Sequence, residues 1–198
     1  DMLVVNNDVP VKTVPELIAL LKAKPGSINM ASSGSGTTIH LAGEMFKQMT
    51  GTDMVHVPYK GSAGALQDLM SGSTQVMFDN MPSCWPLVQA GKMRALGVTS
   101  RTRNKAAPDV PPIADFVPGY NVEVWMGYGG PAGVPQPIVD RLAALGTRAL
   151  EDPGVQQKLA ALGADPWPMA PRALADRIAS EIAVWGPVVK ASGAKVDG

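Results

Sequence analysis

The sequence has a single cysteine and no excess of charge of either sign, and both shortages exclude classes of protein. Cys84 stands alone among 198 residues, so the chain can form neither an internal disulfide nor an all-cysteine metal site. Seventeen Lys and Arg balance 17 Asp and Glu, whereas a nucleic-acid-binding protein normally carries a basic surplus or a basic cluster. Gly, Pro and Ser interrupt every charge-free run well short of the length of a membrane span.

The motifs of nucleotide-binding and hydrolytic enzymes are also missing. The spacing Gly34-x-Gly36 lacks the third glycine of the dinucleotide-binding pattern, which would fall at Ile39. Neither a Gly-Lys-Ser/Thr phosphate-binding loop nor a Gly-x-Ser-x-Gly nucleophile elbow occurs. His40 and His56 are the only histidines, and their separation does not indicate a metal site. We therefore expect neither a cofactor nor a metal.

What the sequence does contain is an alternation of short apolar runs with amphipathic helical patterns over residues 1–100. The predicted strands are Met2–Val5, Ile28–Ala31, Met54–Val57, Thr74–Phe78 and Met93–Val98. The predicted helices are Thr13 to about Lys24, Thr37–Met49, Ala63–Met70 and Trp85–Ala90. The first of them opens on a capping box formed by Thr13 and Glu16. Strands and helices in this order predict an α/β fold with a mostly parallel sheet.

The second half of the sequence has a different texture. A proline-rich stretch over Ala106–Tyr120 predicts a connector, and Val122–Tyr128 is predicted to be one more strand. The remainder is predicted to be helical, over Pro137–Leu150, Val155–Leu162 and Pro171–Ala191. The last helix has an apolar face that includes Ile178, Ile182, Trp185 and Val189. This face needs a surface on which to pack.

The polar candidates for function lie where the predicted strands end. In an open parallel sheet, ligands bind beside the carboxyl ends of the strands, here the loops Ser32–Thr38, Pro58–Ser62, Asp79–Ser83 and Thr99–Arg101. In the first loop Gly34 and Gly36 allow positive φ and close backbone approach. Thr37 and Thr38 place hydroxyls where a helix start has unpaired N–H groups, which suits a carboxylate or a phosphate. The alternative is a turn with an N-cap and no ligand.

Four other side chains are candidates, each with a plain structural alternative. His40 and Glu44 lie four residues apart on one helix face, where they can form a pair or contact a ligand. Asp79 ends a strand, where its carboxylate can bind an amine or hydroxyl or cap the next helix. Lys60 can attract an anion or lie in solvent. An enzyme that uses Asp79 and His40 on such a sheet, for example an isomerase or a transferase, is therefore a rival interpretation.

Several spaced motifs resemble those of the Bug family, the substrate-binding proteins of tripartite tricarboxylate transporters. They are "ASSGSGTTIHLAGEMF", "VHVPYKGSAGALQDLMSG", "VMFDNMPS", "GKMRALGVTS", "GPAGVPQPIVDRL" and "WGPVVKASGAKV", in the family's order from Leu3 to the C-terminus. The resemblance implies a non-enzymatic periplasmic protein, exported by a signal peptide that is then removed. It would bind a di- or tricarboxylate, an acidic amino acid or an aromatic acid, and deliver it to the membrane components of the transporter.

The resemblance also implies a periplasmic-binding-protein-like (type II-like) fold with two α/β lobes around a cleft. Residues 1–121 would form the second lobe, and residues 122–198 would belong to the first. The substrate-binding residues carried over from the family pattern are Gly34, Ser35, Gly36, Thr37, Thr38, His40, Tyr59, Lys60 and Asp79.

Family members begin with about a hundred further residues, roughly the size of a small domain, to which nothing in this sequence corresponds. We therefore expect a chain without the N-terminal part of its first lobe. A third interpretation follows, in which exposed apolar surface makes the chain a homo-oligomer or a domain-swapped dimer. The contacts would be the helical face around Trp185 and a sheet edge at Met2–Val5.

Overall fold

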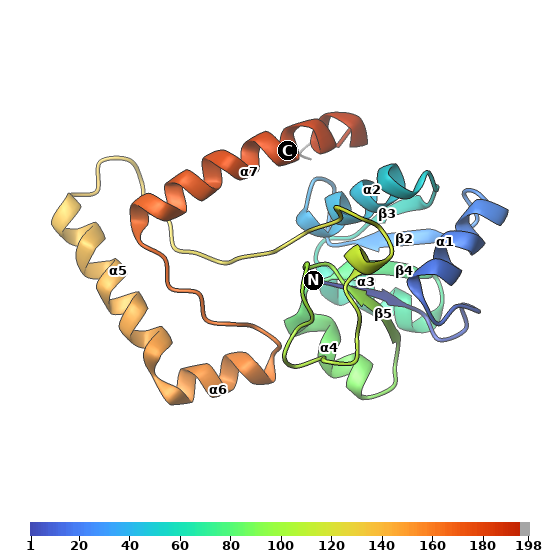
Figure 1. The fold of residues 1–198 in the computed structure, drawn as a ribbon, viewed down its shortest axis with the longest axis horizontal. Helices are drawn as coiled ribbons and strands as arrows, with labels where there is room; N and C mark the ends of the chain where they lie inside the picture. The colour runs from blue at the N-terminus through green and yellow to red at the C-terminus, as the bar shows by residue number, and fades with distance from the viewer. Residues whose placement is uncertain (195–198) are drawn as a thin grey trace.

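A five-stranded sheet forms the centre of the protein, in a computed structural model that describes residues 1–194. The strands are β1 (Met2–Val5), β2 (Asn29–Ser32), β3 (Val55–Pro58), β4 (Val76–Asp79) and β5 (Arg94–Val98), in the order β3-β2-β4-β1-β5. β2 pairs in parallel with both β3 and β4, whereas β1 is antiparallel to β4 and to β5. Four of the strands therefore share one direction, and the expected mostly parallel sheet is confirmed (Figure 1).

β1 lies inside the sheet, so the expectation of a sheet edge at Met2–Val5 is wrong. Its four side chains are fully buried because hydrogen-bonded neighbours flank the strand on both sides. Leu3 and Val5 point to one face and Met2 and Val4 to the other, so each face has its own apolar cluster. A strand without polar alternation fits this position, since both of its faces meet helices.

Two helices cover each face of the sheet. α1 (Val14–Ala23) and α2 (Thr38–Thr50) pack mainly on the face of Leu3 and Val5. α3 (Ser62–Ser71) and α4 (Met81–Gln89) pack on the opposite face. Thr13 caps α1 as predicted, accepting from the N–H of Glu16 at 3.3 Å. We call residues 1–121, which include the short 3₁₀ helix Ile113–Asp115, the sheet lobe.

The rest of the chain forms a C-terminal arm, residues 122–194, that extends away from the sheet lobe (Figure 1). It contains α5 (Gln136–Glu151), α6 (Pro153–Ala161) and α7 (Pro171–Ser192). The predicted strand Val122–Tyr128 is wrong, because this segment finds no partner strand among the described residues and runs as an extended connector. α7 returns to the sheet lobe, where Val188 is buried and Trp185 packs against the core.

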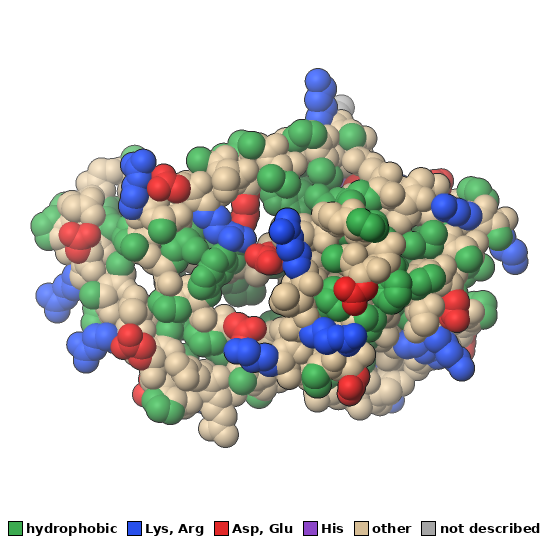
Figure 2. All heavy atoms as spheres, in the orientation of Figure 1, with side chains coloured by type: hydrophobic (Ala, Val, Ile, Leu, Met, Phe, Trp, Pro, Cys, Tyr) green, Lys and Arg blue, Asp and Glu red, His purple; other side chains and the backbone are tan. Residues whose placement is uncertain are grey.

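The C-terminal arm has almost no core of its own. Neither α5 nor α6 buries a single side chain. Figure 2 shows openings between the arm and the sheet lobe, bordered in part by hydrophobic side chains. The large apolar side chains exposed on the arm are Met126, Tyr128, Ile138, Leu142, Leu145, Leu162, Trp167, Ile178, Ile182, Val184 and Val189. Among residues 1–194, no helix combines the length and the apolar character needed to cross a membrane.

Candidate functional site

The loops that follow β2, β3 and β4 meet at the carboxyl edge of the sheet. The N–H of Tyr59 donates to the carbonyl of Ser32, and the N–H of Gly61 donates to the carbonyl of Ser33, both at 3.0 Å. Ser62 Oγ then donates to Asp79 at 2.8 Å, which joins the third loop to the second. Met2 of the antiparallel β1 pairs with Asp79, so this edge lies where the chain begins, on the side of the C-terminal arm (Figure 1).

The first loop, residues 33–37, has the backbone of an anion-binding turn. Gly34 has φ +144° and Gly36 has φ +77°, and residues with a side chain seldom adopt such values. Thr37 is the N-cap of α2: its Oγ1 accepts from the N–H of His40 at 3.4 Å and donates to the carbonyl of Gly34 at 2.8 Å. The hydroxyl proton of Thr37 is therefore already used inside the loop.

Donors for a ligand remain at the neighbouring positions. Within residues 1–194 the backbone N–H groups of Ser35, Thr38 and Ile39 make no hydrogen bond, and neither do the hydroxyls of Ser35 and Thr38. Unpaired N–H groups at the start of a helix are oriented toward an incoming anion and carry partial positive charge. The loop can accordingly neutralise one carboxylate without a cationic side chain.

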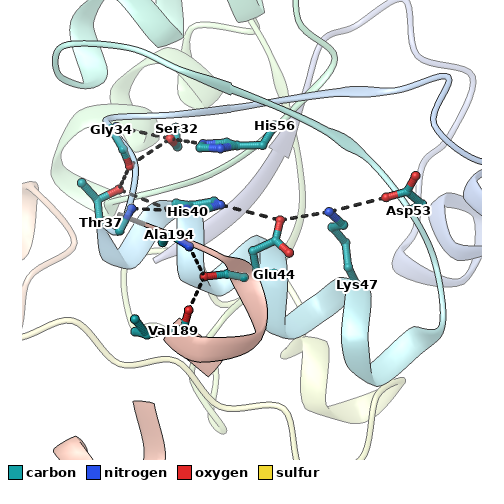
Figure 3. Close-up of polar contacts among 12 residues, drawn as sticks. Ser32, Gly34, Thr37, His40, Glu44, Lys47, Asp53, His56, Val189 and Ala194 are labelled. Atoms are coloured by element: carbon teal, nitrogen blue, oxygen red, sulfur yellow. Dashed lines mark hydrogen bonds and ion pairs between the residues drawn. The ribbon is translucent and has the colours of Figure 1, made fainter. Parts of the chain in front are cut away.

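Both histidines of the protein stand behind this loop (Figure 3). Their rings are stacked, with centroids 3.7 Å apart and planes 9° from parallel. The N–H of Gly36 donates to Nδ1 of His40 at 3.1 Å, and Nε2 of His56 lies 2.6 Å from Ser32 Oγ. Burial, and then the neighbouring His40, lower the pKa of His56 to about 4. No role for His56 could be predicted from the sequence, because its position beside His40 depends on the pairing of β3 with β2.

A short chain of charges extends from His40 along α2. Nε2 of His40 is 3.7 Å from Glu44, which accepts from Lys47 at 2.9 Å, and Lys47 also lies 3.5 Å from Asp53. Burial acts to raise the pKa of Glu44, but hydrogen bonds from His40 and Lys47 outweigh it and the pKa is lowered. His40, Glu44 and Lys47 border an open hollow of about 420 Å³ that the end of α7 closes on one side.

The other predicted site residues lie at the same edge but in different environments. Asp79 is fully buried and accepts from Ser62 and Ser83, so its carboxylate joins the starts of α3 and α4 and does not face solvent. Burial raises the pKa of Asp79, against the effect of the serine hydroxyls. The Tyr59 hydroxyl donates to Asp68 at 2.6 Å, which raises the pKa of Tyr59 to about 12. Lys60 is exposed.

A second hollow, of about 360 Å³, lies between the start of α2 and the C-terminal arm. Thr38 and Leu41 border it on one side and Trp185 on the other. Beside it, Trp125 donates to Glu181 at 2.9 Å, and Arg177 pairs with both Glu181 and Glu123. Arg177 and Glu181 are four positions apart on α7, but Trp125 and Glu123 lie more than 50 positions away from their partners, so no local pattern could have indicated that they join this cluster.

No metal centre is present in the part of the chain that the structure describes. Residues 1–194 contain no group of three or more His, Cys, Asp or Glu side chains that could hold an ion. Cys84 is buried, and that burial raises the pKa of its thiol to about 12, which leaves it without nucleophilic character near neutral pH. The arrangement is suited to holding a small anion by neutral donors.

The sequence of this chain matches a known protein family and several of its members. A family model described as "Tripartite tricarboxylate transporter family receptor" matches residues 1–194. Protein BugT of Bordetella pertussis is 33% identical over 196 residues, which are 98% of this chain and 60% of that protein. A UPF0065 protein in the tcbD-tcbE intergenic region of Pseudomonas sp. strain P51 is 36% identical over 95% of this chain and 56% of its own length.

Solved structures align with nearly the whole chain. Rpa4515 of R. palustris with adipate gives a TM-score of 0.92 at 36% identity, over 98% of this chain and 65% of that one. MatC from Rhodopseudomonas palustris with bound malate gives 0.87 at 31% identity, over 95% and 65%. The periplasmic binding protein BugD gives 0.89 at 29% identity, over 98% and 66%. The chain thus spans about 56 to 66% of the length of these relatives.

Proposed function

The chain belongs to the tripartite tricarboxylate transporter receptor family, and on that premise we propose that the whole protein captures a small organic acid for such a transporter. The family is one of receptors, and a periplasmic binding protein is among the matched structures, so this class of protein binds its ligand without transforming it. The enzyme interpretation accordingly gives way to a binding protein.

The loop of residues 33–37 and the first two residues of α2, Thr38 and Ile39, carry the proposal for the ligand. The unpaired N–H groups of Ser35, Thr38 and Ile39 fit the two oxygens of a carboxylate, and the free hydroxyls of Ser35 and Thr38 add donors beside them. A dicarboxylate is the favoured class, since two relatives above 30% identity are described with adipate and with malate. Tyr59 and Lys60, on the adjoining loop, would border the same ligand.

We also propose that the sheet lobe and the C-terminal arm belong to two different lobes of the whole protein. The sheet lobe has two apolar clusters, whereas no side chain of α5 or α6 is fully buried. Helices with an exposed apolar face need a covering element. About a third of each matched structure has no counterpart in this chain, and a corresponding segment of the whole protein would cover the exposed apolar face. The alternative is that a second copy of this chain covers it.

The proposed site of action is the periplasm, where the protein would pass its ligand to the membrane components of the transporter. Support comes from the relatives, which include a periplasmic binding protein. Interdomain clefts are usual places for small-ligand sites, and the candidate loop faces the C-terminal arm.

The proposal is tested by calorimetric titration of adipate, malate, citrate, glutamate and benzoate into the whole protein, including any chain that its gene encodes before Asp1. We expect at least one dicarboxylate to bind with a single site per chain and to be recovered unchanged. The rival enzyme is supported if the acid is consumed on incubation. Failure of the whole panel to bind would overturn the proposed function.

A further inference from the structure

Two histidines, one buried and one half-buried, support the loop to which the proposed function assigns the carboxylate. His40 comes from α2 and is 4% exposed, while His56 comes from β3 and is half-buried. Their parallel rings are 3.7 Å apart and each reaches the loop at a different point (Figure 3). The two rings therefore help to hold the loop in shape, and their protonation state affects the contacts that they make with it.

The contact of His40 fixes the protonation of its ring. A backbone N–H can only donate, so Nδ1 of His40, 3.1 Å from the nitrogen of Gly36, must present its lone pair. The neutral ring then carries its proton on Nε2, which faces Glu44 at 3.7 Å. Protonation of Nδ1 would set one donor against another. The bond that holds Gly36 at φ +77° therefore exists only with a neutral His40.

The contact of His56 reaches the other end of the loop. Its Nε2 lies 2.6 Å from Ser32 Oγ, and that oxygen lies 3.2 Å from both the N and the O of Gly34. The stacked pair thus supports the two glycines whose backbone the loop depends on. Loss of either ring's contact would release one end of the turn.

Within residues 1–194, the charges around the pair come from few elements. On α2, Glu44 and Lys47 are the nearest, and Asp53, which follows α2, is in contact with Lys47. On β3 the only titratable group facing His40 is His56 itself. At the C-terminal end of α7, Ser192 and the following Gly193 and Ala194 border the same hollow, and none of these three described residues has a titratable side chain. Charging both stacked rings would put two cations in contact, with one carboxylate nearby.

We propose that His40 and His56 are positioning residues that hold the carboxylate-binding loop in shape, and that the bond from Gly36 forms only while His40 is neutral, so that acid weakens the grip on the ligand. The role of the loop in binding rests on the proposed function, whereas the coupling between the rings and the loop does not. The direction in which acid changes the affinity distinguishes this proposal from a direct electrostatic role of the histidines. If the histidines instead attracted the anion directly, acid would strengthen binding, because protonation adds positive charge.

The first measurement needs neither ligand nor variant. The ¹⁵N–¹H signal of the Gly36 amide and the imidazole signals of His40 are followed by NMR from about pH 7.5 to about pH 4.5, the range in which histidines titrate. We expect the Gly36 amide to shift with the midpoint of the His40 ring, and the Gly51 amide at the far end of α2 to stay constant. A Gly36 signal that does not follow His40 would overturn the proposal.

The second measurement uses variants and a named probe, adipate. His40→Leu removes the acceptor for Gly36 and should weaken adipate binding about tenfold or more at about pH 7.5. His40→Asn places Oδ1 where Nδ1 stood, so it should restore most of the lost affinity and make binding less sensitive to acid than in the parent. Protonation of adipate itself affects every variant alike and cancels in the comparison.

The outcomes separate the two proposals. Equal affinity of His40→Leu and the parent, or tighter binding of the parent in acid relative to His40→Asn, would overturn the positioning role. If the parent binds neither adipate nor any other acid of the panel, the proposed function fails, and the Gly36 titration still decides whether the histidines control the loop. His56→Gln, whose amide can reach Ser32, gives a second test should His40→Leu fail to fold.

Discussion

Replacement of Gly36 by alanine separates the shape of the candidate loop from the stability of the fold. Among residues 1–194, a Cβ on Gly36 would meet only the Cβ of Ala194, at 4.0 Å, so none of the described residues would clash with it. The cost comes from the backbone, since φ is +77° and an L-residue in the left-handed region is disfavoured by about 1–2 kcal/mol. Relaxation toward negative φ would turn the N–H of Gly36 away from His40 and reorient the peptide next to Ser35.

The matched control is Gly51→Ala at the other end of the same helix. Gly51 has φ +62° and open space around its Cβ, so the substitution has the same backbone cost without touching the loop. Urea unfolding should show both variants losing about 1–2 kcal/mol of unfolding free energy. Calorimetry with the best ligand of the panel should show a loss for Gly36→Ala alone. One charged hydrogen bond is worth about 1.5–3 kcal/mol, or about ten- to a hundredfold in affinity.

If Gly36→Ala and Gly51→Ala lose equal stability and both bind the ligand as tightly as the parent, the shape of the loop does not contribute to binding. The loop would then be a turn with an N-cap, and the carboxylate would lie elsewhere. If Gly51→Ala also weakens binding, the effect comes from α2 as a whole, and the loop's backbone is not its cause.

Three further predictions follow from particular contacts. Thr38→Val removes a free hydroxyl at the start of α2 and should weaken dicarboxylate binding about tenfold in calorimetry. Thr37→Ala removes the N-cap of α2 and should lower the free energy of unfolding in urea by about 1 kcal/mol. Burial raises the pKa of Asp79 in the folded protein, so the parent loses stability as pH rises from the unfolded pKa through the folded pKa and the carboxylate becomes charged. Asp79→Asn has no such charge and should therefore gain stability relative to the parent as pH rises from about 4 to 7. Equal pH profiles of the two proteins in urea unfolding would contradict this. The 198-residue chain by itself should self-associate through the exposed face that includes Ile182, and light scattering from a monodisperse monomer at high concentration would count against that face being unpartnered.

Helix starts and the order of strands and helices in the sheet lobe were predicted well, because each depends on residues that are close together in the sequence. The capping pattern at Thr13 and the glycines before Thr37 each specify a helix start through their own backbone chemistry, and both starts are confirmed within one residue. The alternation of strands and helices likewise predicted which loops share the carboxyl edge. These features do not depend on partners elsewhere in the chain.

Long-range pairing limited the remaining predictions. An isolated apolar run such as Met2–Val5 does not reveal whether one strand or two will flank it, so its central place in the sheet was missed. The run at Val122–Tyr128 has strand-like residues, but a strand also needs a neighbour to share its hydrogen bonds. The site shows the same limit. His56 stacks on His40 only because β3 pairs with β2, and the Asp79 carboxylate is held inside the protein by hydrogen bonds from two serines on different helices.

We expect the N–H groups of Ser35, Thr38 and Ile39 to hold one carboxylate of the ligand, and a crystal structure of the whole protein with adipate or malate would show whether they do. We expect one carboxylate within about 3 Å of these three nitrogens, the usual range for such hydrogen bonds, with the bond from Gly36 to His40 intact. A ligand whose carboxylates both lie away from the loop, with the three N–H groups bound only to water, would contradict the account.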